Sequence, residues 1–199
     1  MTFYSKLIKA AKNPELVPKM LFDRLKPYHD TIITWKFHET KNIETPAIIC
    51  RVTNDNIDDA LIYEPIEKVN RFRELLAQGD WGYYAYIDDQ WVHRTWVTFG
   101  PKILPQMSRF ALIKLSQGDA FCYWGETSTA ARGKNAQPAV LSQIAEDLKN
   151  KTKNIYTSTS MENKAVYRSV SKAGYVPIRE TRVISFLGIK QERARDLFS

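Results

Sequence analysis

Residues 129–138 read Thr-Ala-Ala-Arg-Gly-Lys-Asn-Ala-Gln-Pro, a basic turn between an aromatic strand-like run and an amphipathic helical pattern. Arg132 and Lys134 are positively charged, and no carboxylate occurs between Thr127 and Ile144. The first amides of a helix have no internal acceptors and carry partial positive charge. The turn therefore predicts a helix N-terminus that binds a phosphate or pyrophosphate group.

Downstream of this turn, helical and strand-like patterns alternate. Residues 138–149 predict a helix with one apolar stripe, and Asn163 and Gly174 are a typical cap and stop for a second helix. Strands are expected at 155–158, 175–178 and 182–187, before a charged tail at 191–199 that is helical or frayed. This half of the chain therefore predicts a strand–helix–strand–helix–strand unit.

Upstream of the turn, aromatic and β-branched runs predict antiparallel strands. The runs 81–87 and 90–99 flank Asp88-Asp89, which is typical of a hairpin. Residues 55–78 have a helical period that Pro65 breaks into two helices. The other expected elements are strands at 31–37, 46–52, 110–115 and 120–127, a loop at 100–105, and helices at 4–11 and 14–25. The mixture predicts an α/β or α+β fold with a mixed sheet.

The composition is that of one globular domain, with or without an extension. Of the 199 residues, 44% are apolar and 26% are charged, and no apolar run approaches the ~20 residues of a membrane span. Lys6 and Lys9 interrupt a short apolar segment at the N-terminus, so we expect no signal peptide. Cys50 and Cys122 lie in apolar runs and are expected to be buried free thiols in a reducing, cytoplasmic setting.

A net charge of +7 and a pI near 9.3 favour an anionic partner. The basic residues are spread along the chain, with no zinc-finger spacing and no RNA-binding aromatic signature. We therefore expect neither nucleic acid nor a membrane as the partner, although a basic protein that binds nucleic acid or an anionic surface remains an open interpretation.

Two segments resemble the GNAT superfamily of acyl-CoA-dependent N-acetyltransferases. Residues 123–127 followed by Arg132-Gly133-Lys134-Asn135-Ala136-Gln137 resemble the pyrophosphate loop R/Q-x-x-G-x-G/A of that family. Asn163 and the later Lys172-Ala173-Gly174-Tyr175 resemble its second signature, an Asn, a helix and then K-x-G-F. The resemblance covers about residues 47–188.

The resemblance implies a mixed, mostly antiparallel central sheet that splays at the cofactor strand and is flanked by helices. It divides the chain into an N-terminal extension at 1–45, an acyltransferase domain at 46–190 and the charged tail at 191–199. Two positions depart from the family pattern, because Asn135 replaces a glycine and Gln137 replaces a glycine or alanine. Asn tolerates a left-handed backbone, whereas Gln137 narrows the approach to the loop.

The implied cofactor is acetyl-CoA or coenzyme A. Backbone amides of the loop would hold its pyrophosphate, the pantetheine arm would lie along residues 123–127, and Gly125 would form a bulge that opens the sheet. The residues expected to bind the cofactor are Gly125, Thr127, Arg132, Gly133, Lys134, Asn135, Ala136, Gln137 and Asn163. Asn163 is explained equally well as a helix cap.

The implied reaction is direct attack of a primary amine on the thioester. Glu126, at the end of the cofactor strand, is the first candidate for the general base, and His93 is the second. Relatives place a tyrosine acid where this chain has Val170, which leaves Tyr167 and Ser171 as neighbouring candidates. No metal is expected.

The sequence thus predicts an N-acetyltransferase that transfers an acetyl or short acyl group to a small molecule or an amino sugar. The alternative is a non-catalytic module that binds and senses acyl-CoA, which the altered loop and the missing tyrosine favour. The resemblance leaves a homodimer open.

Overall fold

The computed structural model describes residues 28–105, 111–186 and 189–197. The helices expected at 4–11 and 14–25 lie outside these residues.

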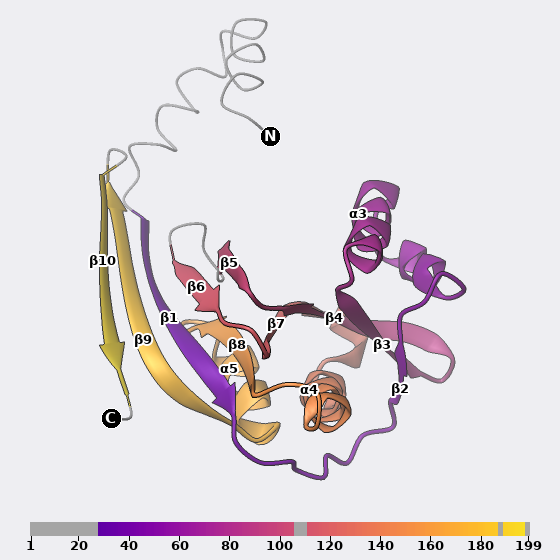
Figure 1. Ribbon diagram of the computed structural model, residues 1–199. Helices are drawn as coiled ribbons and strands as arrows, with labels where there is room; N and C mark the ends of the chain where they lie inside the picture. Colours follow the sequence, from indigo (N-terminus) through magenta and orange to yellow (C-terminus); the bar gives the residue numbers. More distant parts are fainter. Residues whose placement is uncertain (1–27, 106–110, 187–188, 198–199) are drawn as a thin grey trace, which may run out of the picture.

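An eight-stranded, strongly curved sheet forms the body of the molecule (Figure 1). Its strands in chain order are β1 (Tyr28–Phe37), β2 (Ile48–Arg51), β3 (Trp81–Ile87), β4 (Gln90–Phe99), β7 (Asp119–Thr127), β8 (Asn154–Ser160), β9 (Tyr175–Phe186) and β10 (Ile189–Asp196). Their spatial order is β10-β9-β1-β8-β7-β4-β3-β2, and within the described chain only β7 and β8 pair in parallel. The expected mixed, mostly antiparallel sheet is confirmed.

Helices cover both faces of this sheet, because side chains alternate between its faces along each strand. Tyr83 packs in the apolar cluster that contains the inner face of α4, whereas its neighbour Tyr84 packs with the residues of α3. The helices are α3 (Ile66–Ala77), α4 (Ala136–Leu148) and α5 (Lys164–Lys172), with the 3-10 helices η1 (Ile57–Ile62) and η2 (Thr129–Ala131). The aromatic run of the middle strands is thus divided between two cores.

Local signals in the sequence place several elements correctly. Pro65 separates η1 from α3, as its missing amide requires. Asp88 and Asp89 have φ angles of 51° and 57°, the left-handed pair of a two-residue hairpin turn. Asn163 caps α5, since its side chain accepts a hydrogen bond from the amide of Val166 at 3.2 Å.

Three expectations about local structure are wrong, and strand pairing explains each of them. The expected loop at 100–105 contains a strand, β5 (Lys102–Pro105), which pairs with β6 (Leu112–Leu115). The two expected closing strands are one strand, β9, because β1 pairs along most of its length. The charged tail is neither helical nor frayed over residues 189–196, since pairing with β9 makes it the edge strand β10.

β1 lies in the interior of the sheet, although its residues belong to the expected N-terminal extension. It pairs with β8 on one side and with β9 on the other. Trp35 anchors it, with a ring that is buried in the core and an indole Nε1 that donates to Thr159 Oγ1 at 2.9 Å. Removing this strand would expose the facing edges of β8 and β9.

The glycine of the second signature fixes the chain that follows β1. Gly174 has a φ of 87°, and its carbonyl oxygen accepts hydrogen bonds from the amides of His38 and Glu39. A Cβ at residue 174 would lie 1.9 Å from the carbonyl oxygen of Glu39. Both the backbone angle and the close approach therefore require glycine here.

We expect Gly174→Ala to lower the free energy of unfolding by more than about 3 kcal/mol, because a left-handed backbone and a steric clash act together. Gly79→Ala is the matched control, since Gly79 has a φ of 86° but no atom within 4 Å of its would-be Cβ. This control should cost only about 1 kcal/mol. Urea unfolding followed by circular dichroism measures both, and equal losses would contradict the steric argument.

Candidate functional site

β7 and β8 run in parallel but separate partway along their length. Their paired residues extend from Asp119 opposite Asn154 to Cys122 opposite Thr157. Beyond that point β8 stays paired with β1, whereas β7 continues to Thr127. The edge of β7 that faces β8 therefore has open backbone groups over its C-terminal half, as an added strand-like ligand would require.

A β-bulge in β7 accompanies this separation. The register between β4 and β7 shifts between Arg94 and Trp96, so that two residues, Trp124 and Gly125, lie opposite Thr95. Trp124 has a φ of 53°, an uncommon angle for a large side chain. Because bulges bend a strand and re-aim its side chains, the bulge at Gly125 accounts for the divergence of β7.

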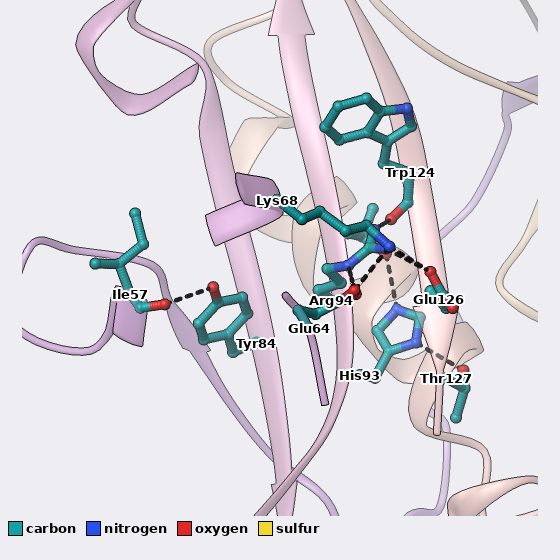
Figure 2. A network of polar contacts seen from close by, with 10 residues as sticks. Ile57, Glu64, Lys68, Tyr84, His93, Arg94, Trp124, Glu126 and Thr127 are labelled. Atoms are coloured by element: carbon teal, nitrogen blue, oxygen red, sulfur yellow. Dashed lines mark hydrogen bonds and ion pairs between the residues drawn. The ribbon is translucent and has the colours of Figure 1, made fainter. Parts of the chain in front are cut away.

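A buried arginine holds this bulge in place (Figure 2). Arg94, with only 3% of its side chain exposed, donates from Nε to Glu64 Oε1 at 2.6 Å and from its other nitrogens to the Trp124 carbonyl and to Glu126. Lys68 completes the network, with its Nζ 2.8 Å from Glu64 Oε2 and 3.2 Å from Glu126 Oε2. All three sides of the guanidinium are thus satisfied.

The charge balance of this network favours an ionised Glu64. Burial by itself would raise the pKa of the Glu64 carboxyl, but hydrogen bonds and positive charge from Lys68 and Arg94 outweigh it and lower the pKa below its ordinary value. Arg94 therefore has a charged partner in the interior, without which its burial would be costly.

The loop before α4 has the geometry of an anion site. Gly133 and Asn135 have φ angles of 83° and 59°, so the asparagine preserves the left-handed turn that the sequence predicts for it. Within the described part of the chain, the backbone amides of Gly133, Asn135, Ala136 and Gln137 have no acceptor. Consecutive amides of this kind at a helix N-terminus bind phosphate.

The side chain of Asn135 joins this loop to the second signature. Its Oδ1 accepts from Lys172 Nζ at 3.0 Å, and its Nδ2 donates to the Glu44 carbonyl at 2.9 Å. Thr45 adds a contact, since its hydroxyl donates to the Lys134 carbonyl at 2.8 Å. The two signatures, which are separated in the sequence, therefore form one surface.

Two cavities meet at Gly125. The first, about 470 Å³, lies between the loop and the start of α5, and the second, about 510 Å³, lies where β7 and β8 separate. The sequence-predicted residues that line the first are Gly125, Glu126, Thr127, Arg132, Gly133, Asn135, Ala136, Gln137 and Asn163. The volumes of the two cavities are in the range of small-molecule binding sites.

Four predicted residues line neither cavity among the described residues: Lys134, His93, Tyr167 and Ser171. Tyr167 instead packs edge-to-face on Trp35, with ring centroids 4.6 Å apart, and Ser171 is exposed. Val170, at the family's tyrosine position, lines the second cavity and offers no proton.

His93 is not an exposed base but a buried, neutral connector. It is fully buried, and its ring nitrogens Nδ1 and Nε2 lie 2.7 Å from Thr127 Oγ1 and 2.8 Å from Thr95 Oγ1. Desolvation, with a smaller contribution from Arg94, lowers its pKa to about 3. This burial disfavours His93, the second candidate for the general base in the sequence analysis.

Glu126 does reach both cavities, with 59% of its side chain exposed. The sequence led us to expect a carboxylate in a partly apolar cleft, whereas the structure pairs its Oε2 with Lys68 and Arg94. Among the described residues, no partner contacts Oε1, which leaves this oxygen for a ligand or water.

The sequence analysis missed residues that line the cavities. Val166 and Ser169 follow Asn163 at helical spacing, so the periodicity of α5 could have found them. No local pattern marks Lys68 and Arg94, because they reach the second cavity only through the packing of α3 on β4. No metal-binding group of His, Cys, Asp and Glu occurs among the described residues, and none of their helices is long and apolar enough to cross a membrane.

Comparison with known proteins shows the fold. No family model and no curated protein sequence matches the chain. Among solved structures, an acetyltransferase of the GNAT family from Colwellia psychrerythraea aligns with a TM-score of 0.59 and 12% identity, over 90% of this chain and 62% of the other. A putative GNAT acetyltransferase from Novosphingobium aromaticivorans aligns at 0.55 and 12%, over 78% and 63%.

A third similar structure, with a TM-score of 0.59 and 12% identity, is the glucosamine N-acetyltransferase region of a fungal multidomain β-N-acetylglucosaminidase. It aligns over 85% of this chain and 22% of the other. The chain thus spans just over three-fifths of the length of each of the two bacterial proteins. The chain has the fold of GNAT acetyltransferases.

The buried neutral His93 predicts a distinct acid sensitivity. The pKa of His93 is lowered in the folded state. Its contribution to the free energy of unfolding is therefore fully present above pH about 6.5, its pKa in the unfolded chain, and is lost as the pH falls toward 3. We expect His93→Gln to reduce the slope of unfolding free energy against pH, between about pH 5.5 and 4, by up to about 1.4 kcal/mol per pH unit. Urea titrations at several pH values measure this slope. His38→Gln, at an exposed histidine, is the control. An unchanged slope in His93→Gln would contradict the buried neutral state of His93.

Proposed function

We propose that this protein transfers an acetyl or short acyl group from acyl-CoA to a primary amine of a small molecule. The observation that supports this most is the loop of unpaired amides at Gly133 and residues 135–137, next to the open edge of β7. An acyl-CoA has a pyrophosphate for the first and a peptide-like pantetheine arm for the second. The likeness in fold to GNAT acetyltransferases agrees with this assignment.

The charges around the first cavity suit a polyanionic ligand. Arg132 lines this cavity, and Lys134 is exposed on the same loop. The Nζ of Lys172 lies 3.0 Å from Asn135 Oδ1. The N-terminus of α4, which follows this loop directly, adds the partial positive charge of its backbone amides. Glu126, which lines both cavities, is the proposed base, with its Oε1 taking the proton of the amine directly or through water as the amine attacks the thioester carbonyl.

We expect Arg132→Glu combined with Lys134→Glu to weaken acetyl-CoA binding by about tenfold or more, because two attractive charges become repulsive at the phosphates. Isothermal titration calorimetry at low and moderate salt measures the effect. Lys149→Glu combined with Lys151→Glu is the control, since it gives the same change in net charge at the other end of α4. A folded wild-type protein that binds neither acetyl-CoA nor CoA would refute the proposal.

We expect Glu126→Gln to lower turnover by about 100-fold while acetyl-CoA binding persists, because an amide cannot take the proton. The assay follows release of the CoA thiol over a panel of primary amines, which includes amino sugars because one similar structure is a glucosamine N-acetyltransferase region. Lys68→Met is the control, since it breaks an ion pair of Glu126 but keeps the carboxylate. Wild-type turnover in Glu126→Gln would exclude the base.

A second candidate function is a module that binds acyl-CoA without turnover. Val170, which lines the second cavity with 1% of its surface exposed, favours it because this position offers no acid for the leaving thiolate. Steady CoA release with any amine would exclude this alternative. Tight binding of acetyl-CoA without release across the whole panel would support it.

A further inference from the structure

Because Gly125 has no side chain, two polar groups remain accessible where the two cavities meet. A Cβ built on Gly125 would lie 3.3 Å from Thr95 Oγ1 and 3.5 Å from Gln137 Nε2. Gly125 and Gln137 line both cavities, and Thr95 lines the second. A ligand atom in the space beside Gly125 would therefore be within reach of a hydroxyl and an amide at once.

Both polar groups can still make a hydrogen bond to a ligand. The side-chain amide of Gln137 has no hydrogen-bond partner among the described residues, although the residue is half-buried. Thr95 is 2% exposed, and its one recorded side-chain partner in the described chain is His93 Nε2 at 2.8 Å. Thr95 is buried, and buried polar groups usually have hydrogen-bond partners, so its hydroxyl and the neighbouring side-chain amide of Gln137 are suited to a ligand atom.

His93 bridges the hydroxyls of Thr127 and Thr95, and its tautomer decides which way each hydroxyl points. A neutral imidazole donates from one nitrogen and accepts at the other. When the Thr127 hydroxyl donates to Nδ1, Nε2–H donates to Thr95 Oγ1, and the Thr95 hydroxyl proton is left for an acceptor beside Gly125. Figure 2 shows the contact between His93 and Thr127. The complete burial of His93 keeps water from competing with this chain.

We propose that Thr95 and Gln137 form a two-donor subsite for the thioester carbonyl oxygen of bound acyl-CoA, and that His93 is the positioning residue that directs the Thr95 hydroxyl into it. This inference rests on the proposed function. A carbonyl oxygen accepts two hydrogen bonds in the directions of its lone pairs, and both bonds strengthen as negative charge develops on it during amine attack. Gln137, a departure from the family's small residue, thereby acquires a role.

The test compares acetyl-CoA with S-ethyl-CoA, a thioether of nearly the same size that lacks only the carbonyl oxygen. Calorimetry with the full chain should show that the wild-type protein binds acetyl-CoA more tightly. Thr95→Val and Gln137→Ala should each reduce this preference by about threefold to tenfold, the value of one hydrogen bond. Gly125→Ala should abolish it by filling the point while leaving both donors in place.

Two pairs of variants separate positioning from simple folding effects. Thr95→Ser keeps the hydroxyl and should keep the preference, unlike Thr95→Val. His93→Gln places a side-chain amide near the position of Nε2 and should keep it, whereas His93→Leu should reduce it as Thr95→Val does. Affinity for S-ethyl-CoA should stay within about twofold in the Thr95 and His93 variants and reports that the cofactor site is folded. Gln137 and Gly125 are themselves cofactor-binding residues, so their variants are compared by the preference for acetyl-CoA over S-ethyl-CoA.

The outcomes distinguish this inference from the function on which it rests. A wild-type protein that binds neither ligand refutes the proposed function itself. Binding of both with equal affinity overturns the subsite alone, as does an unchanged preference in Thr95→Val and Gln137→Ala. A preference that falls in His93→Gln as much as in His93→Leu overturns the positioning role of His93.

Discussion

The candidate site depends on one buried guanidinium. Arg94 lies beneath the bulge of β7 and donates to the Trp124 carbonyl, which the bulge would otherwise leave without a partner from the neighbouring strand. Its charge is compensated by Glu64, and its remaining nitrogen reaches Glu126. An ordinary β-ladder would pair β7 with β8 to the end and close the cavity between them. The bulge, which this arginine holds, keeps the sheet open.

The two ends of the site are joined by short polar contacts instead of by a shared core. Asn135 takes a backbone angle that most residues avoid, and its side chain contacts both Lys172 and the Glu44 carbonyl. Gly174 then fixes the chain next to β1 through its carbonyl oxygen. Substitutions in this region therefore combine local backbone effects with changes at the loop before α4.

Parts of the site could be predicted because they depend on backbone requirements that a few residue types satisfy. Gly125 marked the bulge, Asn135 the left-handed turn and Asn163 the cap of α5, and each position is where the sequence predicts it. The roles of His93 and Tyr167 could not be assigned in this way. Whether a polar side chain faces a cavity or a neighbouring side chain depends on packing. His93 contacts Thr95 and Thr127, and Tyr167 packs on Trp35.

The sequence by itself determined the order of most strands and helices and the left-handed turn at 132–137 before α4, because hydrophobic period, caps and left-handed residues act over a few positions. Only the tertiary structure decided that residues 28–37 lie between β8 and β9, that the charged tail pairs as a strand, and that Lys68 meets Glu126. These outcomes depend on contacts between residues far apart in the chain, where burial and strand pairing override local preference.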